Sequence, residues 1–342
     1  MQIVVNTKHM LHQSPGELTA DGYVPAFEKP ERAELVLARA NEVGLGPVVT
    51  ETPHDLADIL RIHDSGMVNL LQHGAAEWAT LGHPPGAIPF TWATRGMRQH
   101  RVPTSLDGRL SWYCFDAGTP LTPTSWEAIK ASADCALTAA DILAGGAASA
   151  FALCRPPGHH AGADYYGGYC FLNNIAIAAQ KLLDKGAKRI AILDVDYHHG
   201  NGTQQIFYHR ADVLVVNLHA DPNVEYPFHL GYADEPGTGA GEGFNLNYPM
   251  PFGTAWDNYA LALADGIKRI AAYAPDAVLV SLGVDTYKGD PISQFKLDHP
   301  DYLTMGEMIK TLGLPTIFVM EGGYAVAEIG INAVNVLTGF GG

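Results

Sequence analysis

Short apolar runs alternate with longer amphipathic segments along the chain from about residue 125 onward. Continuous apolar runs rich in β-branched residues are typical of strands buried on both faces, and apolar residues recurring every three or four positions predict helices. The expected strands are 150–154, 190–195, 213–218, 277–282 and 316–320. The expected helices are 126–143, 173–185, 203–209, 256–273, 302–312 and 327–337, the first with Ser125 as its N-cap.

The first third of the chain is less regular. A strand is expected over residues 1–5, and helices over 31–43 and 63–72. Between them lie two long segments without a regular pattern, 7–27 and 83–123; such loops often serve binding or assembly. With no internal repeat and no break in composition, the pattern predicts one α/β domain over residues 1–342. Its expected architecture is three α-β-α layers around a central, mainly parallel sheet.

Composition and charge narrow the function classes. With 47% hydrophobic and 17% charged residues, the chain can bury a large core and is not a disordered protein. Its net charge of -15 argues against a nucleic-acid partner, which would need clustered Lys and Arg. The acidic surface would help to steer a cationic small molecule towards a cleft. Alternatively, most of these carboxylates only maintain solubility.

The sequence also carries signals about the compartment. No apolar run is long enough to span a bilayer, and residues 1–5 lack the features of a secretory signal, so no membrane association is expected. The cysteines show no CxxC spacing, which predicts neither a zinc knuckle nor a disulfide framework. They are Cys114, Cys135, Cys154 and Cys170. The expected location is the reducing cytoplasm.

Ionisable residues follow the expected strands at the same end. In open parallel sheets the active site lies beyond the carboxyl ends of the strands. The residues found there are Arg155, His159, His160, Asp194, Asp196, His198, Asn201, His219, Asp285, Glu321 and Tyr324. Several strands that deliver such residues to one edge predict a catalytic centre at that edge.

The end of the strand at 190–195 has the pattern of a metal site. Positions two apart in an extended chain project to the same side, so Asp194, Asp196 and His198 can face one pocket. Two carboxylates and an imidazole crowded together need a cation to neutralise them. With Asp285, the set Asp196 and His198 resembles the three protein ligands of a catalytic zinc site, which leaves one position open. An isolated Asp-x-His is usually a surface pair, but this one ends a buried strand.

His159, His160 and Tyr324 are candidate catalytic residues. The histidines follow a rigid Pro-Pro-Gly turn and can provide the general base and acid for metal-assisted hydrolysis, with Asp194 and Asn201 to hold their tautomers. Tyr324 follows two glycines, where its phenol can donate to a developing oxyanion. The alternatives are that tandem histidines reflect surface composition and that Tyr324 is a structural tyrosine.

Together these motifs resemble the histone deacetylase superfamily of arginase-like fold, and within it the bacterial acetylpolyamine amidohydrolases. The resemblance covers essentially the whole chain. Its most specific segments are 155–160 (Arg-Pro-Pro-Gly-His-His), 167–174, 194–203 and 321–324 (Glu-Gly-Gly-Tyr). It implies one zinc ion per chain, held by Asp196, His198 and Asp285.

The resemblance also implies roles for the neighbouring residues. His160 takes the position of the general base and acid with Asn201 behind it, and His159 that of its companion, paired with Asp194. Tyr324 polarises the substrate carbonyl. A structural potassium ion is expected near Asp194, bound largely by backbone carbonyls of residues 194, 196 and 198; Asn217 stands where many relatives have Ser. Tyr169 and Tyr226 are expected to wall a narrow substrate tunnel.

Segments 7–27 and 83–123 correspond to insertions of the polyamine-type relatives. The resemblance implies that they form a homodimer in which the partner narrows the active-site entrance. Glu17 corresponds to an acidic residue that meets a substrate ammonium group, and Asp107 and Asp116 are further acidic candidates. The alternative for these three carboxylates is a solvated surface position.

The function implied is zinc-dependent removal of an acyl group, acetyl above all, from small amines such as acetylputrescine and acetylcadaverine. The same chemistry could instead serve uncharged amides, because Trp92, Met97, Trp112 and Phe115 could line an apolar entrance or pack in a dimer interface. A protein lysine deacetylase is a further alternative. An arginase-like enzyme with two manganese ions is disfavoured, because Gly283 and Gly200 stand where additional carboxylates would be needed. A non-catalytic binding protein is disfavoured by the complete set of chemical residues.

Overall fold

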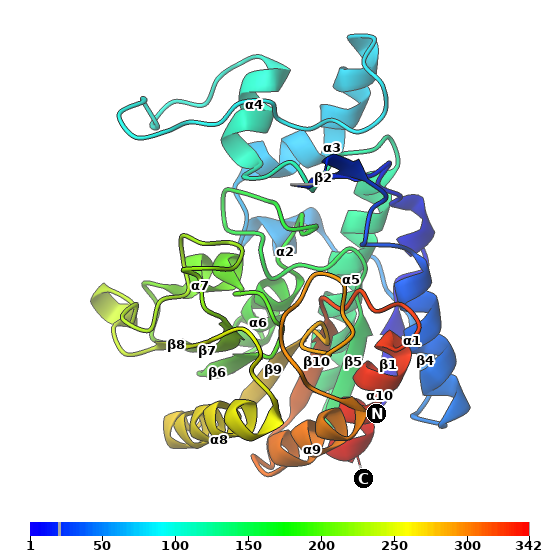
Figure 1. Ribbon diagram of the computed structural model, residues 1–342, viewed down its shortest axis with the longest axis vertical. Coiled ribbons are helices and arrows are strands. Elements are labelled where there is room, and N and C mark those ends of the chain that lie inside the picture. Colours follow the sequence, from blue (N-terminus) through cyan, green and yellow to red (C-terminus); the bar gives the residue numbers. More distant parts are fainter. Residues whose placement is uncertain (20–21, 342) are drawn as a thin grey trace.

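A central parallel sheet organises the computed structural model, which describes residues 1–19 and 22–341 (Figure 1). Within these residues its strand order is β4-β1-β5-β10-β9-β6-β7-β8, and every neighbouring pair is parallel. The strands are β1 Gln2–Val5, β4 Val48–Thr50, β5 Ser149–Leu153, β6 Ile190–Asp194, β7 Val213–Ala220, β8 Asn245–Met250, β9 Ala277–Leu282 and β10 Thr316–Met320.

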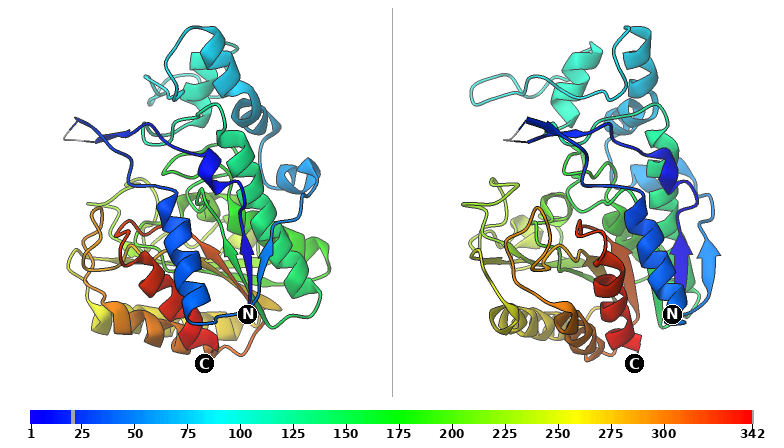
Figure 2. Two further views of the ribbon diagram at one scale, coloured as in Figure 1. Left: turned by 90° about the vertical axis from the view of Figure 1, so that its right-hand side faces the viewer. Right: turned by 45° about the vertical axis from the view of Figure 1, so that its right-hand side comes forward.

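Helices cover both faces of this sheet. The helices on one face are α5 Ser125–Ala144 and α6 Asn174–Asp184; those on the other are α1 Glu31–Glu42, α8 Trp256–Tyr273, α9 His299–Lys310 and α10 Ile329–Gly341 (Figure 2). Successive strand residues serve opposite cores: Ala150 and Ala152 pack on the side of α5, and Phe151 and Leu153 on the side of α10. The predicted three-layer α/β fold is confirmed.

The register of the central strands aligns the chemical motifs. Asp194 at the end of β6 lies opposite Asn217 on β7 and Ser281 on β9. Since the strands are parallel, the segments that follow β5, β6, β9 and β10 leave the sheet at the same edge. Residues far apart in the sequence are therefore brought together there.

The sequence pattern missed several shorter elements. They are β2 Glu17–Thr19, β3 Gly22–Val24, β4, β8, α2 Leu56–Leu60, α4 Leu106–Tyr113 and the 3-10 turns His9–Leu11 and Gly239–Gly241. Thus segment 7–27, whose residues 20–21 lie outside the described residues, carries a hairpin, and segment 83–123 carries a helix. Strand β8 reads Asn-Leu-Asn-Tyr-Pro-Met, too polar to give a buried-strand signal at the sheet edge. Helix α3, Ser65–Thr80, extends beyond the predicted end at 72, and α7 spans Asn201–Phe207.

The start of α5 corrects one prediction. The helix begins at Ser125, its N-cap is Thr124, and no side chain caps it. The Ser125 hydroxyl instead accepts a hydrogen bond from the Thr122 backbone N–H at 2.9 Å and lies 2.9 Å from Nδ1 of His12. A tertiary contact to segment 7–27 has replaced the local capping bond.

A buried charge cluster joins segment 7–27 to the sheet. Glu28 accepts from Arg155 Nε at 2.8 Å and Arg155 Nη2 at 2.9 Å, and from Arg32 Nη1 at 2.9 Å. Arg155 also donates to the backbone carbonyls of His9 and His12. Burial opposes ionisation of Glu28, but the two guanidinium groups outweigh it and lower the pKa of this carboxyl. The cluster anchors the loop beside the motif that follows β5.

The remaining elements extend the molecule beyond the sheet. Helices α3 and α4 and the β2–β3 hairpin lie at one end of the molecule, away from α8 and α9 (Figures 1 and 2). Among the helices that the structure describes, none is both long enough and apolar enough to cross a membrane.

Candidate active site

A cavity of about 630 Å³ opens above the carboxyl edge of the sheet. Its wall combines residues from strand ends with residues from the long loops. They include Glu17, Asp116, His160, Gly168, Tyr169, His198, Tyr226 and Tyr324. The structure thus brings most of the sequence-predicted site residues to one place.

Asp196, His198 and Asp285 form a compact set of metal-ligand atoms at the base of this site. All three are buried, and one ligand atom of each lies within 4.8 Å of the others. Nδ1 of His198 is 3.0 Å from Asp285 Oδ2 and 3.5 Å from Asp196 Oδ1. An imidazole and two carboxylates are the donors that catalytic zinc sites use.

The backbone holds these carboxylates in place. Asp285 Oδ1 accepts from the Tyr197 N–H at 2.8 Å, and Asp196 Oδ2 accepts from the Gly322 N–H at 2.8 Å. Burial, reinforced by the charge of Asp196, raises the pKa of Asp285 to about 7. Two buried carboxylates that resist ionising together are stabilised by a divalent cation, so the donor set fits a metal ion.

Glycine makes this crowding sterically feasible. A Cβ on Gly283 would lie 2.0 Å from Asp196 Oδ2, and one on Gly200 would lie 2.4 Å from Asp194 Oδ2. Neither position can carry a side chain without moving a carboxylate. The crowding agrees with the expectation from the sequence that glycine at these two positions disfavours a binuclear site.

The two histidines have separate partners. Nδ1 of His159 lies 3.1 Å from Asp194 Oδ2, and Nδ1 of His160 lies 2.7 Å from Asn201 Oδ1. Burial lowers the pKa of His159, but the charges of Asp196 and Asp194 outweigh it and raise this pKa to about 10. For His160, burial and the neighbouring His159 hold the pKa well below its usual value. One member of the pair therefore carries a proton while the other is neutral.

The partner of His160 sets its tautomer. The Asn201 amide nitrogen donates to the Tyr165 hydroxyl at 3.3 Å, so its oxygen is the group that faces His160. That oxygen can only accept, and the hydrogen on neutral His160 must then sit on Nδ1. Nε2 is left as a lone-pair acceptor, as a general base requires.

Tyr324 is held by residues that the sequence reading had not singled out. Its backbone N–H donates to Asp290 Oδ2 at 2.6 Å, and the Arg32 guanidinium lies 4.7 Å from its ring centroid. Arg32 also donates to the carbonyls of Gly323 at 2.6 Å and Glu321 at 2.5 Å. Burial raises the pKa of Tyr324 well above its usual value, so the phenol keeps its proton and remains a donor. Arg32 lies on the buried face of α1 with Val36 and Ala40. A charged residue at an apolar position of the helix pattern is the sequence signal that could have identified it.

Tyr169 and Tyr226 stand on either side of the catalytic residues. The ring centroid of Tyr169 lies 5.5 Å from that of Tyr324, and the centroid of Tyr226 lies 5.2 Å from that of His160. Their edge-to-face geometry is a favourable aromatic arrangement. The two rings line the cavity.

Comparison with known proteins identifies the family. The family profile described as the histone deacetylase domain matches residues 26–340. This chain belongs to the histone deacetylase family. It is therefore a hydrolase of amide bonds with a metal-dependent active site, as the resemblance implied.

Individual members of the histone deacetylase family resemble the chain over its full length. Acetylpolyamine amidohydrolase 2 of Pseudomonas aeruginosa is 57% identical over 100% of this chain and 99% of its own length. Acetylpolyamine amidohydrolase of Mycoplana ramosa is 50% identical, with 100% of both chains covered. The crystal structure of acetylpolyamine aminohydrolase from Burkholderia pseudomallei has a TM-score of 0.95 at 36% identity, covering 100% of this chain and 98% of that one. The predicted resemblance to acetylpolyamine amidohydrolases is confirmed.

The acidic candidates of this deacetylase-family chain lie in different environments. Glu17, on β2, is only 4% exposed, and its Oε2 has no hydrogen-bond partner among the described residues. Burial raises the pKa of Glu17 to about 7. A hydrogen bond from the Tyr169 hydroxyl to the carboxylate opposes this shift, and the negative charge of Asp116 adds to it. Asp116 lies in the cavity wall, whereas Asp107 is half-exposed in the first turn of α4, outside the described lining of the cavity.

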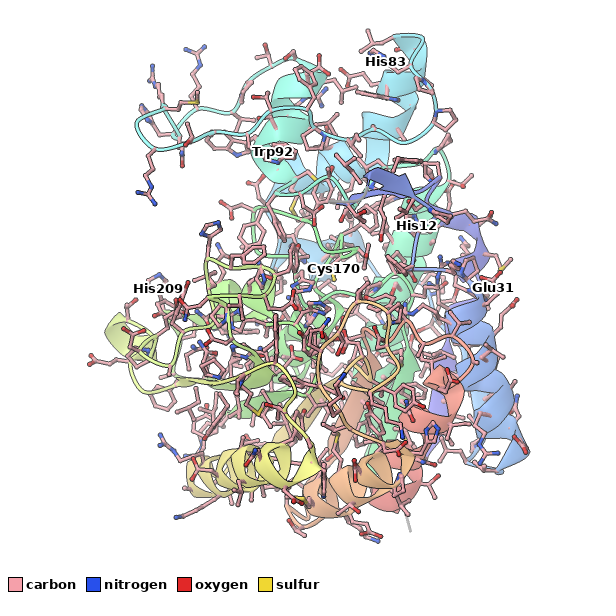
Figure 3. The ribbon with its side chains drawn as sticks, in the orientation of Figure 1. His12, Glu31, His83, Trp92, Cys170 and His209 are labelled. Atoms are coloured by element: carbon pink, nitrogen blue, oxygen red, sulfur yellow. The ribbon has the colours of Figure 1, made fainter. Side chains whose placement is uncertain are left out.

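The aromatic candidates for an apolar entrance also separate. Phe115 stacks on Tyr226 with centroids 5.9 Å apart, and Trp112 packs against the core. Trp92 and Met97, on segment 83–123, are 40% and 58% exposed. Figure 3 labels Trp92 above Cys170, towards the end of the molecule that carries α4, and Trp92 Nε1 donates to the Cys114 carbonyl at 2.9 Å. None of these four aromatic and apolar candidates is among the described residues that line the cavity.

Proposed function

We propose that this chain is a zinc-dependent amidohydrolase that removes acetyl groups from small N-acylated amines such as acetylputrescine and acetylcadaverine. The observation that carries the choice of substrate is Glu17, a buried carboxylate that shares one cavity with His160, His198 and Tyr324. The relatives named acetylpolyamine amidohydrolase over the full chain length support the same substrate class.

Glu17 favours a cationic substrate for an energetic reason. A buried carboxylate oxygen without a partner is costly, because it has lost its hydration and gained no hydrogen bond. An ammonium group that enters the cavity restores both a charge partner and a donor. A neutral amide of the same length offers neither, so the charged substrate gains binding free energy that the neutral one lacks.

In the proposed mechanism the family's metal site supplies electrophilic assistance. Asp196, His198 and Asp285 would hold the zinc ion, whose chemistry is to polarise the amide carbonyl and lower the pKa of water. Nε2 of His160 accepts the proton of the attacking water, while Asn201 keeps the Nδ1 hydrogen in place. The protonated companion His159 stabilises the charges of Asp194 and Asp196.

Tyr324 and the histidine pair also act in the formation and breakdown of the tetrahedral state. The Tyr324 phenol donates a hydrogen bond to the former carbonyl oxygen as its negative charge develops. An imidazolium of the histidine pair then protonates the leaving nitrogen, so that the C–N bond breaks to give acetate and a free amine. Arg32 and Asp290 keep the Tyr324 backbone in place during both steps.

We propose in addition a structural potassium ion near Asp194, bound largely by the backbone carbonyls of residues 194, 196 and 198. Asp194 is fully buried, and Asn217 lies opposite it on β7. A buried carboxylate at this position favours a nearby cation. Thermal unfolding of the zinc-loaded protein should shift upward in potassium relative to tetramethylammonium salts.

Quaternary structure and location complete the proposal. We expect residues 1–342 to form one domain whose segments 7–27 and 83–123 join two copies and narrow the entrance. Exposed apolar side chains support this: Leu18 and Tyr23 on the hairpin are 59% and 65% exposed, and Phe90 on segment 83–123 is 75% exposed. Sedimentation equilibrium of the full chain tests the dimer.

The four cysteines are free and buried, which supports a location in the reducing cytoplasm.

The proposed activity is tested by kcat/KM of the zinc-loaded protein on a matched panel. The panel contains acetylputrescine, acetylcadaverine, an acetyl-lysine peptide and acetanilide as a neutral amide. The acetylated diamines should be preferred by at least about tenfold, the value of one charge-assisted contact. Preference for acetanilide would make the protein an amidase of uncharged amides, and preference for the peptide would make it a lysine deacetylase.

A further inference from the structure

Asp116 has its carboxylate surrounded by donors from the protein itself. Oδ1 accepts from the Gly118 N–H at 3.0 Å and the Thr119 hydroxyl at 3.1 Å. Oδ2 accepts from the Gly168 N–H at 2.6 Å and the Tyr226 hydroxyl at 2.9 Å. A carboxylate offers about four lone-pair positions, so its acceptor capacity is used. A substrate ammonium could bind there only by displacing one of these donors.

Two of these contacts hold a turn whose backbone conformation is unfavourable for Tyr169. Gly168 and Tyr169 lie at φ 59° and 65°, in the left-handed region, where a tyrosine persists only if its surroundings hold it. The Tyr169 N–H donates to the Thr119 hydroxyl at 2.9 Å, and that hydroxyl donates to Asp116. The Asp116 carboxylate therefore holds the N–H of Gly168 directly and that of Tyr169 through Thr119.

Oδ2 of Asp116, which accepts from the Gly168 N–H, also accepts from the hydroxyl of Tyr226. Tyr226 comes from the loop after β7. A Cβ on Gly168 would lie 2.9 Å from the Tyr226 hydroxyl and 2.3 Å from His160 Cδ2, so the turn, the phenol and the catalytic imidazole are in close contact. The contact to Asp116 requires the hydroxyl, and a phenylalanine at position 226 could not make it. Asp116 thus spans the gap between the turn that carries Tyr169 and the ring of Tyr226.

We infer that Asp116 is a positioning residue that clamps the two aromatic walls of the substrate tunnel together and so sets the tunnel's width. It does not pair with the substrate's charge; that task falls to Glu17, whose Oε2 is without a partner among the described residues. The inference rests on the proposed function, because the tunnel width matters through the substrate that the tunnel admits. Two carboxylates of one cavity thereby have different tasks, one for shape and one for charge.

The test uses three substrates and ratios of kcat/KM. Acetylcadaverine is cationic and linear, N-pentylacetamide is neutral and linear, and N-(pentan-2-yl)acetamide is neutral and branched beside the nitrogen. Above about pH 8, where Glu17 is ionised with or without the charge of Asp116, Asp116→Asn should lower kcat/KM for both linear substrates by the same factor. The loss should be about tenfold, because the substitution replaces an acceptor with a donor facing the Gly168 N–H. The linear-to-branched ratio should fall about fivefold or more as the tunnel loosens. A ratio of two substrates does not depend on the fraction of protein that is folded.

Two further variants sharpen the test. Tyr226→Phe should lower the linear-to-branched ratio by itself, and should add less than about twofold in the Asp116→Asn background, since the contact is already lost. If Asp116→Asn does not fold, Tyr226→Phe alone decides the question through this ratio. Asp265→Asn is the matched control: it removes a carboxylate that accepts from Tyr248 at 2.6 Å on the exposed surface of α8, and should change no ratio.

Other results would overturn the clamp. A loss confined to acetylcadaverine would make Asp116 an ammonium site. An unchanged linear-to-branched ratio, or independent effects of the Asp116 and Tyr226 variants, would mean that Asp116 does not set the width. If the wild-type protein hydrolyses none of the three substrates, the proposed function has failed, and the clamp is judged separately. Calorimetric binding of a linear and a branched hydroxamate to the zinc-loaded variants then gives the same ratio.

Discussion

The strand-end site and the loop-built entrance of this protein meet in one cavity but are constructed in different ways. Asp196, His198 and Asp285 leave adjacent parallel strands, and backbone N–H groups hold their carboxylates. The entrance combines Glu17 from the β2–β3 hairpin and Asp116 from segment 83–123, both outside the central sheet. Under the proposed function, the fold provides the chemistry and the loops provide the choice of substrate.

The two regions also differ in how they treat charge. At the strand ends, each carboxylate lies against an imidazole or several donors, an arrangement that suits a resident cation. At the entrance, Asp116 is saturated and Glu17 keeps an unpaired oxygen. Mutations in the first region should therefore remove activity on every substrate, and mutations in the second should change the ratio between substrates.

The largest effect should come from His198→Ala, which removes one of the three clustered ligand atoms. Zinc content should fall well below about one ion per chain and activity should reach the detection limit, because two carboxylates alone do not make a catalytic zinc site. Atomic emission and kcat/KM on acetylcadaverine measure the two quantities. His209→Ala changes an exposed histidine that bonds Thr238 and serves as the control. Full zinc content in His198→Ala would contradict the assignment.

Tyr324→Phe should produce the next largest effect. Loss of one donor to a developing oxyanion costs roughly two to three orders of magnitude in kcat. The loss should be the same for charged and neutral amides, and zinc content should not change because Tyr324 lies outside the ligand cluster. Tyr273→Phe loses a comparable phenol hydrogen bond, to Ala211 O at 2.8 Å, far from the site and is the control. Near-normal turnover would sink the role of Tyr324.

Glu17→Gln should lower kcat/KM for the charged substrate much more than for the neutral one. Loss of a charge-assisted contact should lower kcat/KM for acetylcadaverine by roughly tenfold to hundredfold, mainly through KM, with a much smaller change for N-pentylacetamide. An equal loss on both substrates would remove the distinction between an entrance that selects charge and a site that performs chemistry. Glu51→Gln, which removes an exposed carboxylate bonded to Thr7, is the control.

The same comparison predicts a pH dependence. Burial raises the pKa of Glu17 to about 7, so its carboxyl is neutral below this pH and ionised above it. Only the ionised form attracts an ammonium group, so the ratio of kcat/KM for acetylcadaverine over N-pentylacetamide should rise between about pH 6 and 8 and then level off. Using the ratio cancels titrations that both substrates share. In Glu17→Gln the ratio should be flat; a wild-type ratio that falls with pH would contradict the sign.

The smallest effect is expected from Asp107→Asn. This carboxylate lies on the first turn of α4 and is half-exposed, outside the cavity lining described for one chain. A solvent-screened charge in such a position should change kcat/KM for acetylcadaverine by less than about twofold. A tenfold loss at dimer-forming concentrations would instead show that a second copy brings Asp107 to the entrance.

The sequence alone predicted the central strands closely, because each is a continuous apolar run of the length that a buried parallel strand needs. Strands β9 and β10 have the expected bounds. Strand β5 is shifted by one residue at each end, β6 ends one residue earlier, and β7 ends two residues later than predicted. It failed on β8 and the β2–β3 hairpin, which are short or polar and depend on neighbours for pairing. It also predicted a capping role for Ser125 that a contact with His12 overrides.

What the sequence determined is therefore local: the order of strands and helices, and the ionisable residues that follow each strand. Hydrophobic periodicity and motif spacing report these because they depend on neighbours within a few positions. Only the tertiary structure decided that Arg32 lies over the Tyr324 ring, that Asp116 is saturated and that Glu17 is not. A carboxylate's task depends on the donors that surround it, and those donors come from residues distant in the chain. Their proximity exists only after the sheet and loops have packed.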